Sequence, residues 1–149
     1  MVASFECRTR LAVPVPEAFD RARSIDLHIG SMAASRERAV RGVTSGLIEA
    51  GQEVTWRARH LGVTFTMTSR ITRMSRPESF VDEQLRGPFA SFRHEHRFEP
   101  DGDGTLMLDR VDFGPPLGVL GRLAELVLRP CLRRLIEHRN AHLAATPLP

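Results

Sequence analysis

The stretch 117–143 constrains the fold of this chain most, because no other segment is long enough to form a major helix. Its apolar residues recur at steps of three and four, which places them on one helical face: Leu120, Leu123, Ala124, Val127, Cys131, Leu135 and Ile136. The first half is apolar on almost every side, and such a helix has to be covered on every side. We therefore expect the first half to lie in the concavity of a sheet and the arginine-rich second half to emerge at the surface.

Pro130 lies in the middle of this stretch. A proline inside a helix removes one backbone hydrogen bond and clashes with the preceding turn. Because the apolar stripe resumes in phase after Pro130, we expect one helix with a kink near residues 126–129 and not two helices.

The chain length of 149 residues favours one domain over residues 1–149, and a chain of this length can bury a substantial core. Residues 144–149 have no pattern, and we expect them to fray. No apolar run approaches membrane-spanning length and the N-terminus lacks a signal-peptide pattern, so we expect a cytoplasmic protein without stable membrane insertion. Cys7 and Cys131 are far apart, which favours two buried thiols over a disulfide.

The charged residues exclude several functions. All 21 basic residues are arginine, and the chain has neither lysine nor tyrosine. Without lysine, Schiff-base chemistry and a Walker-type phosphate loop are excluded. The pI is near 10.0, but the net charge is only +3 and the arginines alternate with acids. This favours a solvated surface, and we expect no nucleic-acid partner.

Alternating residues before the helix predict a sheet. Phe5, Cys7 and Leu11 share one face of a strand at 4–13, and further strands are expected at 36–44, 52–60, 63–73, 80–85, 89–98 and 105–113. Two short helical pieces are expected at 16–19 and 24–28, with Ser24 as a cap between them. Sequential antiparallel strands with one long helix packed on a face define an α+β domain.

The sequence Asp-Gly-Asp-Gly at 101–104 is a strong hairpin signal and fixes a register. Pairing about its centre sets Phe92, His94, His96 and Phe98 opposite Phe113, Val111, Asp109 and Met107, all pointing inward. On the outer face it sets Arg93 opposite Asp112 and Glu95 opposite Arg110, two mildly stabilising pairs. A slip of one residue would turn every side chain to the other face.

His94, His96 and Asp109 are therefore expected on an apolar inner face, where polar groups need partners. Asp82 joins them if the 87–88 hairpin pairs it with His94, whereas a slip would place Glu83 inside. Three interpretations stay open: a structural network (His96 with Asp109, His94 with Asp82), a polar anchor for a ligand, or catalysis or metal binding. We expect no metal, because histidines and carboxylates on a sheet more often bond to each other, and no cofactor.

Several short motifs resemble a known family. Phe80-Val-Asp82, Gly87-Pro-Phe89, Phe92-Arg-His94-Glu-His96-Arg-Phe98, Gly104-Thr105, Asp109 and Pro116-Leu-Gly118 are similar to a bacterial subfamily of the SRPBCC superfamily, the START/birch-pollen-allergen-like helix-grip proteins. The resemblance covers nearly the whole chain. It implies a helix-grip fold, a curved antiparallel sheet wrapped around the long C-terminal helix with a cavity between them, and it implies ligand binding more strongly than catalysis. Without tyrosine, a polyketide cyclase mechanism that needs a tyrosine acid does not transfer.

We therefore expect a binding module for a hydrophobic or amphipathic small molecule, such as a lipid, an isoprenoid or a polyketide. The expected cavity walls are Trp56, Phe65, Met67, Phe92, Phe98, Met107, Val111, Phe113, Leu120, Ala124 and Val127, and the expected anchors are Asp82, His94, His96 and Asp109. One alternative is a polyketide cyclase or dehydratase with His94 or His96 as general base beside Asp109. Another is a protein-interaction module that uses the arginine-rich helix end. The sequence also leaves a homodimer open.

Overall fold

The computed structural model describes residues 2–60, 62–116 and 121–149. Its elements follow in the order β1 (Ala3–Leu11), α1 (Val15–Ala22), α2 (Ile25–Ser31), the short 3-10 helix η1 (Ala33–Ser35), β2 (Arg38–Gly42), β3 (Glu53–His60), β4 (Val63–Ser75), β5 (Ser79–Arg86), β6 (Ser91–Asp101), β7 (Gly104–Gly114) and α3 (Gly121–Ala145). The strands form one antiparallel sheet in the order β1-β7-β6-β5-β4-β3-β2.

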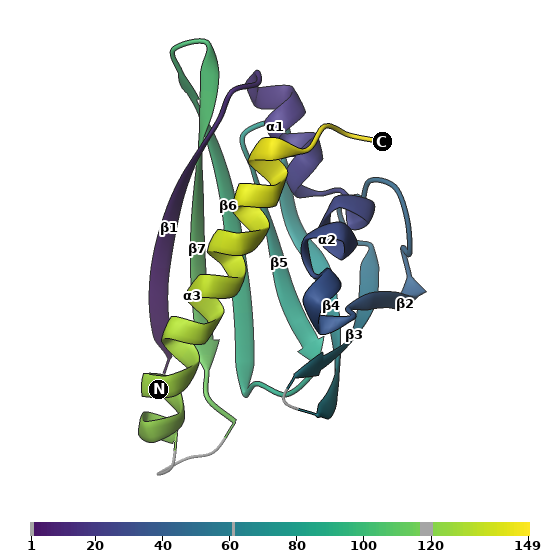
Figure 1. The fold of residues 1–149 in the computed structure, drawn as a ribbon, viewed down its shortest axis with the longest axis vertical. Helices are drawn as coiled ribbons and strands as arrows, with labels where there is room; N and C mark the ends of the chain where they lie inside the picture. Colours follow the sequence, from purple (N-terminus) through teal and green to yellow (C-terminus); the bar gives the residue numbers. More distant parts are fainter. Residues whose placement is uncertain (1, 61, 117–120) are drawn as a thin grey trace.

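The α+β helix-grip prediction is confirmed. The sheet curves around α3, which runs along β1 on the inner face, while α1 and α2 cover another part of the same face (Figure 1). Two local signals position the short helices: Pro16 stands in the first turn of α1, and the Ser24 side chain accepts a hydrogen bond from the Leu27 N–H at 3.2 Å. Ser24 is thus the predicted cap.

The register expected from the 101–104 turn is also confirmed. Phe92, His94, His96 and Phe98 pair with Phe113, Val111, Asp109 and Met107. The less secure β5 register is confirmed as well, because Asp82 pairs with His94, and Glu83 with Arg93 on the outer face. The sheet therefore presents Asp82, His94, His96 and Asp109 on its inner face.

The burial of α3 is the reverse of the expectation. Its first half exposes Leu123, Leu126 and Val127 by 65%, 73% and 59%, whereas Ile136, Arg139, Asn140 and Leu143 in its second half are buried. The reason is that Arg139 and Asn140 donate hydrogen bonds into the interior, so the second half is the one that the fold encloses.

Around Pro130, α3 continues as a single helix, as expected, and the kink stays a prediction. The start of the predicted helix, residues 117–120, lies outside the described residues. At the other end α3 reaches Ala145, and Leu148 packs against the core. The expectation of two buried thiols is wrong for Cys131, which is exposed because α3 packs on the sheet through Leu128, Leu132 and Ile136, whereas Cys7 is buried.

Two apolar clusters fill part of the space between sheet and helices. The larger one gathers α1, α2 and the C-terminal end of α3 around Leu11, Phe19, Phe80, Phe98, Met107 and Leu143. The smaller one joins β1, β7 and the middle of α3 through Phe5, Val111, Phe113 and Ile136, with Leu128 and Leu132 against it. Among the described residues, no helix is both long enough and apolar enough to cross a membrane.

Candidate functional site

A buried polar network lies on the inner face where β5, β6 and β7 run side by side. His94 Nε2 lies 2.7 Å from Asp109 Oδ1, and His96 Nε2 lies 2.8 Å from Asp82 Oδ2. The sequence predicts His96 with Asp109 and His94 with Asp82. His96 Nδ1 does lie 3.2 Å from Asp109 Oδ1, but the carboxylate closest to each ring is the other one. The two imidazole rings stack with centroids 3.8 Å apart.

Two residues of α3 complete this network, and the sequence reasoning missed both. Asn140 Nδ2 donates to Asp109 Oδ2 at 2.7 Å, and Arg139 Nη1 lies 3.5 Å from Asp109 Oδ1. A signal for them was present, because Ile136, Arg139, Asn140 and Leu143 are spaced like the buried face of a helix. Asp109, whose side chain is fully buried, thus joins α3 to the centre of the sheet.

Opposing effects set the pKa values of the groups in this network. Burial alone would raise the pKa of Asp109, but the hydrogen bonds and charges of His94 and His96 hold it well below its usual value. Burial would likewise raise the pKa of Asp82, but the hydrogen bond with His96 and the nearby charges of His94 and Arg139 lower it. Burial and the neighbouring His96 lower the pKa of His94 despite Asp109. Both carboxylates are therefore ionised and His94 is neutral at pH 7.

Asp82, His94 and His96 each bring one candidate metal-ligand atom within 4.8 Å of the others. Two features limit their fit to a metal. The Nε2 atoms of both histidines already face carboxylates at hydrogen-bond distance, the two rings stack on one another, and His96 also stacks on Phe80. The metal-free interpretation stays a prediction.

The inner face beside this network is only partly covered. Trp56 pairs with Met67, and Ala58 with Phe65, so these side chains follow the buried Val54 along one face. Trp56, Met67 and Phe92 are half-buried, Phe65 is 38% exposed, and the Asp82 side chain is 23% exposed. His94, His96 and Asp109 are almost fully buried by comparison. Asp82 is therefore the member through which the network reaches accessible space.

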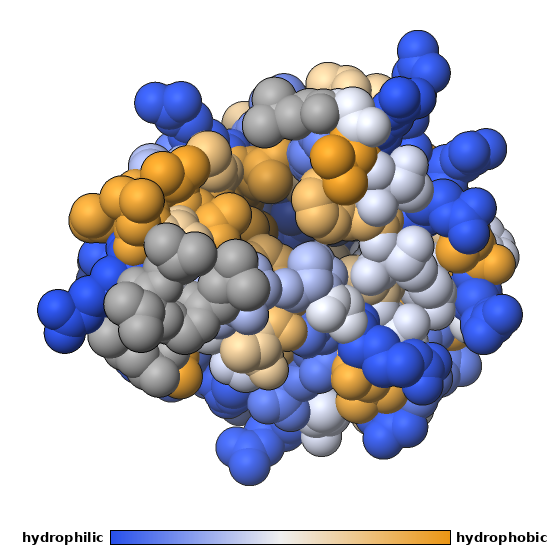
Figure 2. Space-filling model, turned by 90° about the horizontal axis from the view of Figure 1, so that it is seen from below, coloured by the Kyte–Doolittle hydropathy of each residue, from blue (hydrophilic) through white to orange (hydrophobic). Residues whose placement is uncertain are grey.

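The uncovered region opens at one end of the sheet, where β3 turns into β4, β5 into β6, and β7 leads to α3. We call segments 2–4, 58–60, 62–66, 84–91, 114–116 and 121–129 the open end. Figure 2, which views the molecule from this side, shows a hollow flanked by hydrophobic side chains. Inside the turn between β5 and β6, Gln84 donates to the Phe89 carbonyl at 2.8 Å and accepts from the Phe89 N–H at 3.3 Å, which holds the rim in shape.

The remaining predicted wall residues have different environments. Phe98, Met107, Val111 and Phe113 are buried within the two apolar clusters. On α3, Ala124 is half-buried and Val127 is exposed, while Leu120 lies outside the described residues. Of the predicted site residues on the sheet, Trp56, Phe65, Met67, Phe92 and Asp82 thus keep some exposure, whereas Phe98, Met107, Val111 and Phe113 are buried.

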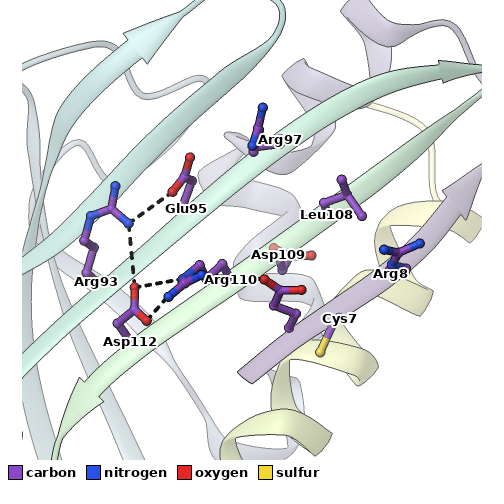
Figure 3. Close-up of a pocket in the computed structure, with 10 residues that line it drawn as sticks. Cys7, Arg8, Arg93, Glu95, Arg97, Leu108, Asp109, Arg110 and Asp112 are labelled. Atoms are coloured by element: carbon purple, nitrogen blue, oxygen red, sulfur yellow. Dashed lines mark hydrogen bonds and ion pairs between the residues drawn. The ribbon is translucent and has the colours of Figure 1, made fainter. Parts of the chain in front are cut away.

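The outer face of the sheet has a separate depression of about 400 Å³, lined by charged side chains of β1, β6 and β7 (Figure 3). Arg93 pairs with Asp112 at 3.7 Å, as predicted. Arg110 and Glu95 are opposite each other, as predicted, but the close partner of Glu95 is Arg93 at 3.1 Å, and Arg110 pairs with Asp112 at 3.3 Å. Such exposed ladders stabilise a sheet modestly, and they need no ligand.

Comparison with known proteins identifies the family of this chain. A family model described as polyketide cyclase / dehydrase and lipid transport matches residues 26–141. No curated protein matches the sequence.

Three solved structures illustrate the likeness of fold. A protein from Thermus thermophilus is 12% identical, with 96% of this chain and 98% of that chain covered and a TM-score of 0.75. The Zhui aromatase/cyclase from a Streptomyces species is 15% identical, with 97% and 93% covered and a TM-score of 0.74. A ginseng major latex-like protein from Panax ginseng is 14% identical, with 99% of both chains covered and a TM-score of 0.66.

Proposed function

The chain belongs to the polyketide cyclase / dehydrase and lipid transport family, and on that premise we propose that it binds a hydrophobic or amphipathic small molecule between the inner face of the sheet and α3. One observation carries the proposal. Apolar inner-face side chains, among them Trp56, Met67 and Phe92, stay partly uncovered on the face that also carries the partly exposed carboxylate of Asp82. An apolar pocket with few polar groups is the usual layout of a small-molecule site.

The ionisation state of Asp82 indicates which group the polar end of the ligand carries. Its lowered pKa keeps the carboxyl group ionised, so that it accepts hydrogen bonds and donates none. The ligand is therefore expected to carry a hydroxyl group at the end that lies beside Asp82. Its apolar part would cover Trp56, Met67 and Phe92, gaining about 25 cal/mol for each Å² of apolar surface removed from water.

A fluorescence titration tests this proposal. Trp56 is the only tryptophan of the chain. It lies on the inner face, and its ring is tilted against that of His28 with centroids 4.3 Å apart. Addition of anilinonaphthalene sulfonate or a hydroxy fatty acid should change the Trp56 emission and saturate at one molecule per chain. Met67→Glu, which places a charge on the apolar wall, should weaken this binding at least tenfold.

Thr66→Glu is the matched control, because Thr66 is the exposed neighbour of Met67 on the opposite face of β4. It should bind like the unmodified protein. Equal weakening by both substitutions, or a Trp56 emission that no apolar probe changes, would reject the proposed site.

A second candidate is a cyclase or dehydratase, and one observation favours it. Asp82 is the accessible carboxylate, and His96 lies 2.8 Å behind it, an arrangement suited to a general base. In that case the wild-type protein, incubated with its own retained ligand, converts it to a cyclised isomer or to a product lighter by one water, and Asp82→Asn does neither. A ligand unchanged in both mass and chromatographic retention in the two samples would support binding without catalysis.

A further inference from the structure

We propose that the open end docks on an anionic lipid bilayer. Its apolar residues are the first reason. Of the eight large apolar side chains that are strongly exposed among the described residues, seven lie there: Val2, Val63, Phe65, Leu85, Leu123, Leu126 and Val127. Only Val40, on the edge strand β2, lies elsewhere. Apolar side chains gathered in this way mark an interaction surface, and Figure 2 shows hydrophobic side chains on more than one side of the hollow.

The distribution of charge is the second reason. Apart from its apolar residues, the open end carries Arg59, Arg86, Arg122 and Arg129 against one acid, Glu125. These residues give it a net charge of +3, which equals the net charge of the entire chain. The rest of the molecule is therefore neutral in sum, although most of the arginines lie in it.

The arginines at this end are available for an external anion. Within the described part of the chain, only Arg129 of the four has an acidic partner, Glu125 at 2.7 Å. The opposite end differs in sign, because its 98–105 hairpin carries Glu99, Asp101 and Asp103, and Arg10 of β1, which pairs with Asp101 and Asp103, offsets only part of that charge. The molecule thus approaches an anionic surface with its open end first.

A bilayer fits this surface better than a second copy of the chain or another protein. Two copies meeting here would bring two +3 surfaces together, which charge repulsion opposes. The exposed apolar side chains come from four separate segments: the start of β1, the turn between β3 and β4, the end of β5 and the first turns of α3. A lipid interface accepts such scattered apolar side chains without a complementary shape, and each arginine near anionic headgroups adds roughly 1 kcal/mol.

The docking surface itself is argued independently of the proposed function, but the role of docking in ligand transfer rests on it. If the hollow holds a hydrophobic molecule, docking would place its mouth against the membrane, so that the molecule could pass between bilayer and protein without crossing water. The contact would be peripheral, in agreement with the expectation of no stable membrane insertion.

Vesicle co-sedimentation of the full chain tests the proposal. The probes are phosphatidylcholine vesicles and vesicles of phosphatidylcholine with one third phosphatidylglycerol, at low and high salt. Binding should be at least tenfold tighter to the anionic vesicles, and high salt should weaken it because salt screens exposed charges. Leu123→Ser/Leu126→Ser and Arg86→Glu/Arg122→Glu should each lower the affinity at least tenfold.

Val40→Ser and Arg73→Glu are the matched controls, because both residues are exposed and lie outside the open end. They should bind like the unmodified protein. Equal binding to both kinds of vesicle, equal losses in the control variants, or no binding to anionic vesicles would overturn the proposal, and the last result would point to an acidic protein instead. The titration of Trp56 in solution separates the two proposals. Probe binding without vesicle binding rejects only the docking, and vesicle binding without probe binding rejects only the ligand site.

Discussion

His94 shows how a single residue is adapted to the interior of this protein. Its ring is almost fully buried, pairs with Asp109 at 2.7 Å and stacks on His96. Burial and the neighbouring His96 lower its pKa although Asp109 acts in the opposite direction. The folded protein therefore favours the neutral imidazole at this position.

This lowered pKa predicts a loss of stability in mild acid. The unfolded chain takes up a proton at His94 near pH 6.5, whereas the folded chain does so only at a lower pH. As the pH falls below about 6.5, the unfolded state binds more protons, and the free energy of unfolding decreases by at most about 1.4 kcal/mol per pH unit. The lowered pKa values of Asp82 and Asp109 extend the loss to lower pH, below about 4.

Urea denaturation between pH 7 and pH 5 measures this effect. His94→Gln should flatten the dependence of unfolding free energy on pH in this range. His138→Gln is the control, because His138 is exposed on α3, and it should keep the slope of the unmodified protein. A slope that His94→Gln leaves unchanged would show that His94 does not titrate as its environment implies.

At the scale of elements, the network joins α3 to the sheet. Asp109 on β7 accepts hydrogen bonds from His94 on β6 and Asn140 on α3, and Arg139 beside them donates to the Ala22 carbonyl at the end of α1 at 3.0 Å. The Asp109 carboxylate at the centre of these contacts is fully buried. Its removal leaves several buried donors without an acceptor.

Asp109→Ala should therefore lower the free energy of unfolding by about 3–5 kcal/mol, the usual cost of breaking a buried charge pair. Asn140→Ala should cost about 1–3 kcal/mol, since it removes one buried hydrogen-bond donor. Asp103→Ala, in the turn after β6, is the control. Its side chain is 98% exposed, and it should cost less than about 1 kcal/mol. Chemical denaturation measures all three, and a cost for Asp109→Ala as small as that of Asp103→Ala would contradict the role of the network.

The strand register could be predicted from the sequence, whereas the partners within the network could not. Alternation and the 101–104 turn place the backbone of His94 opposite Val111 and that of His96 opposite Asp109. Which carboxylate each ring meets depends on side-chain rotamers, which the pairing pattern does not fix. The expectation that the first half of α3 is buried rests on its apolar residues alone and takes no account of polar residues that find partners inside. Arg139 and Asn140 are enclosed since the interior supplies Asp109 and a backbone carbonyl as partners.

The molecule as a whole has a filled part and an uncovered part. Around Phe19, Phe80, Phe98 and Leu143, helices cover the sheet and the side chains are buried. Toward the open end, apolar side chains of the same inner face stay partly exposed, as do those of the first turns of α3. Covering these apolar side chains would increase the stability of the folded protein. The uncovered part is the region that we assign to a ligand.

Native mass spectrometry tests the ligand site most directly. The unmodified protein, Met67→Glu and Thr66→Glu are purified side by side from their host without detergent and sprayed under identical conditions. We predict that the unmodified protein and Thr66→Glu each carry the same apolar molecule at one per chain, and that Met67→Glu carries none. A molecule retained equally by all three proteins, or absent from all three, would contradict a binding site between the inner face of the sheet and α3.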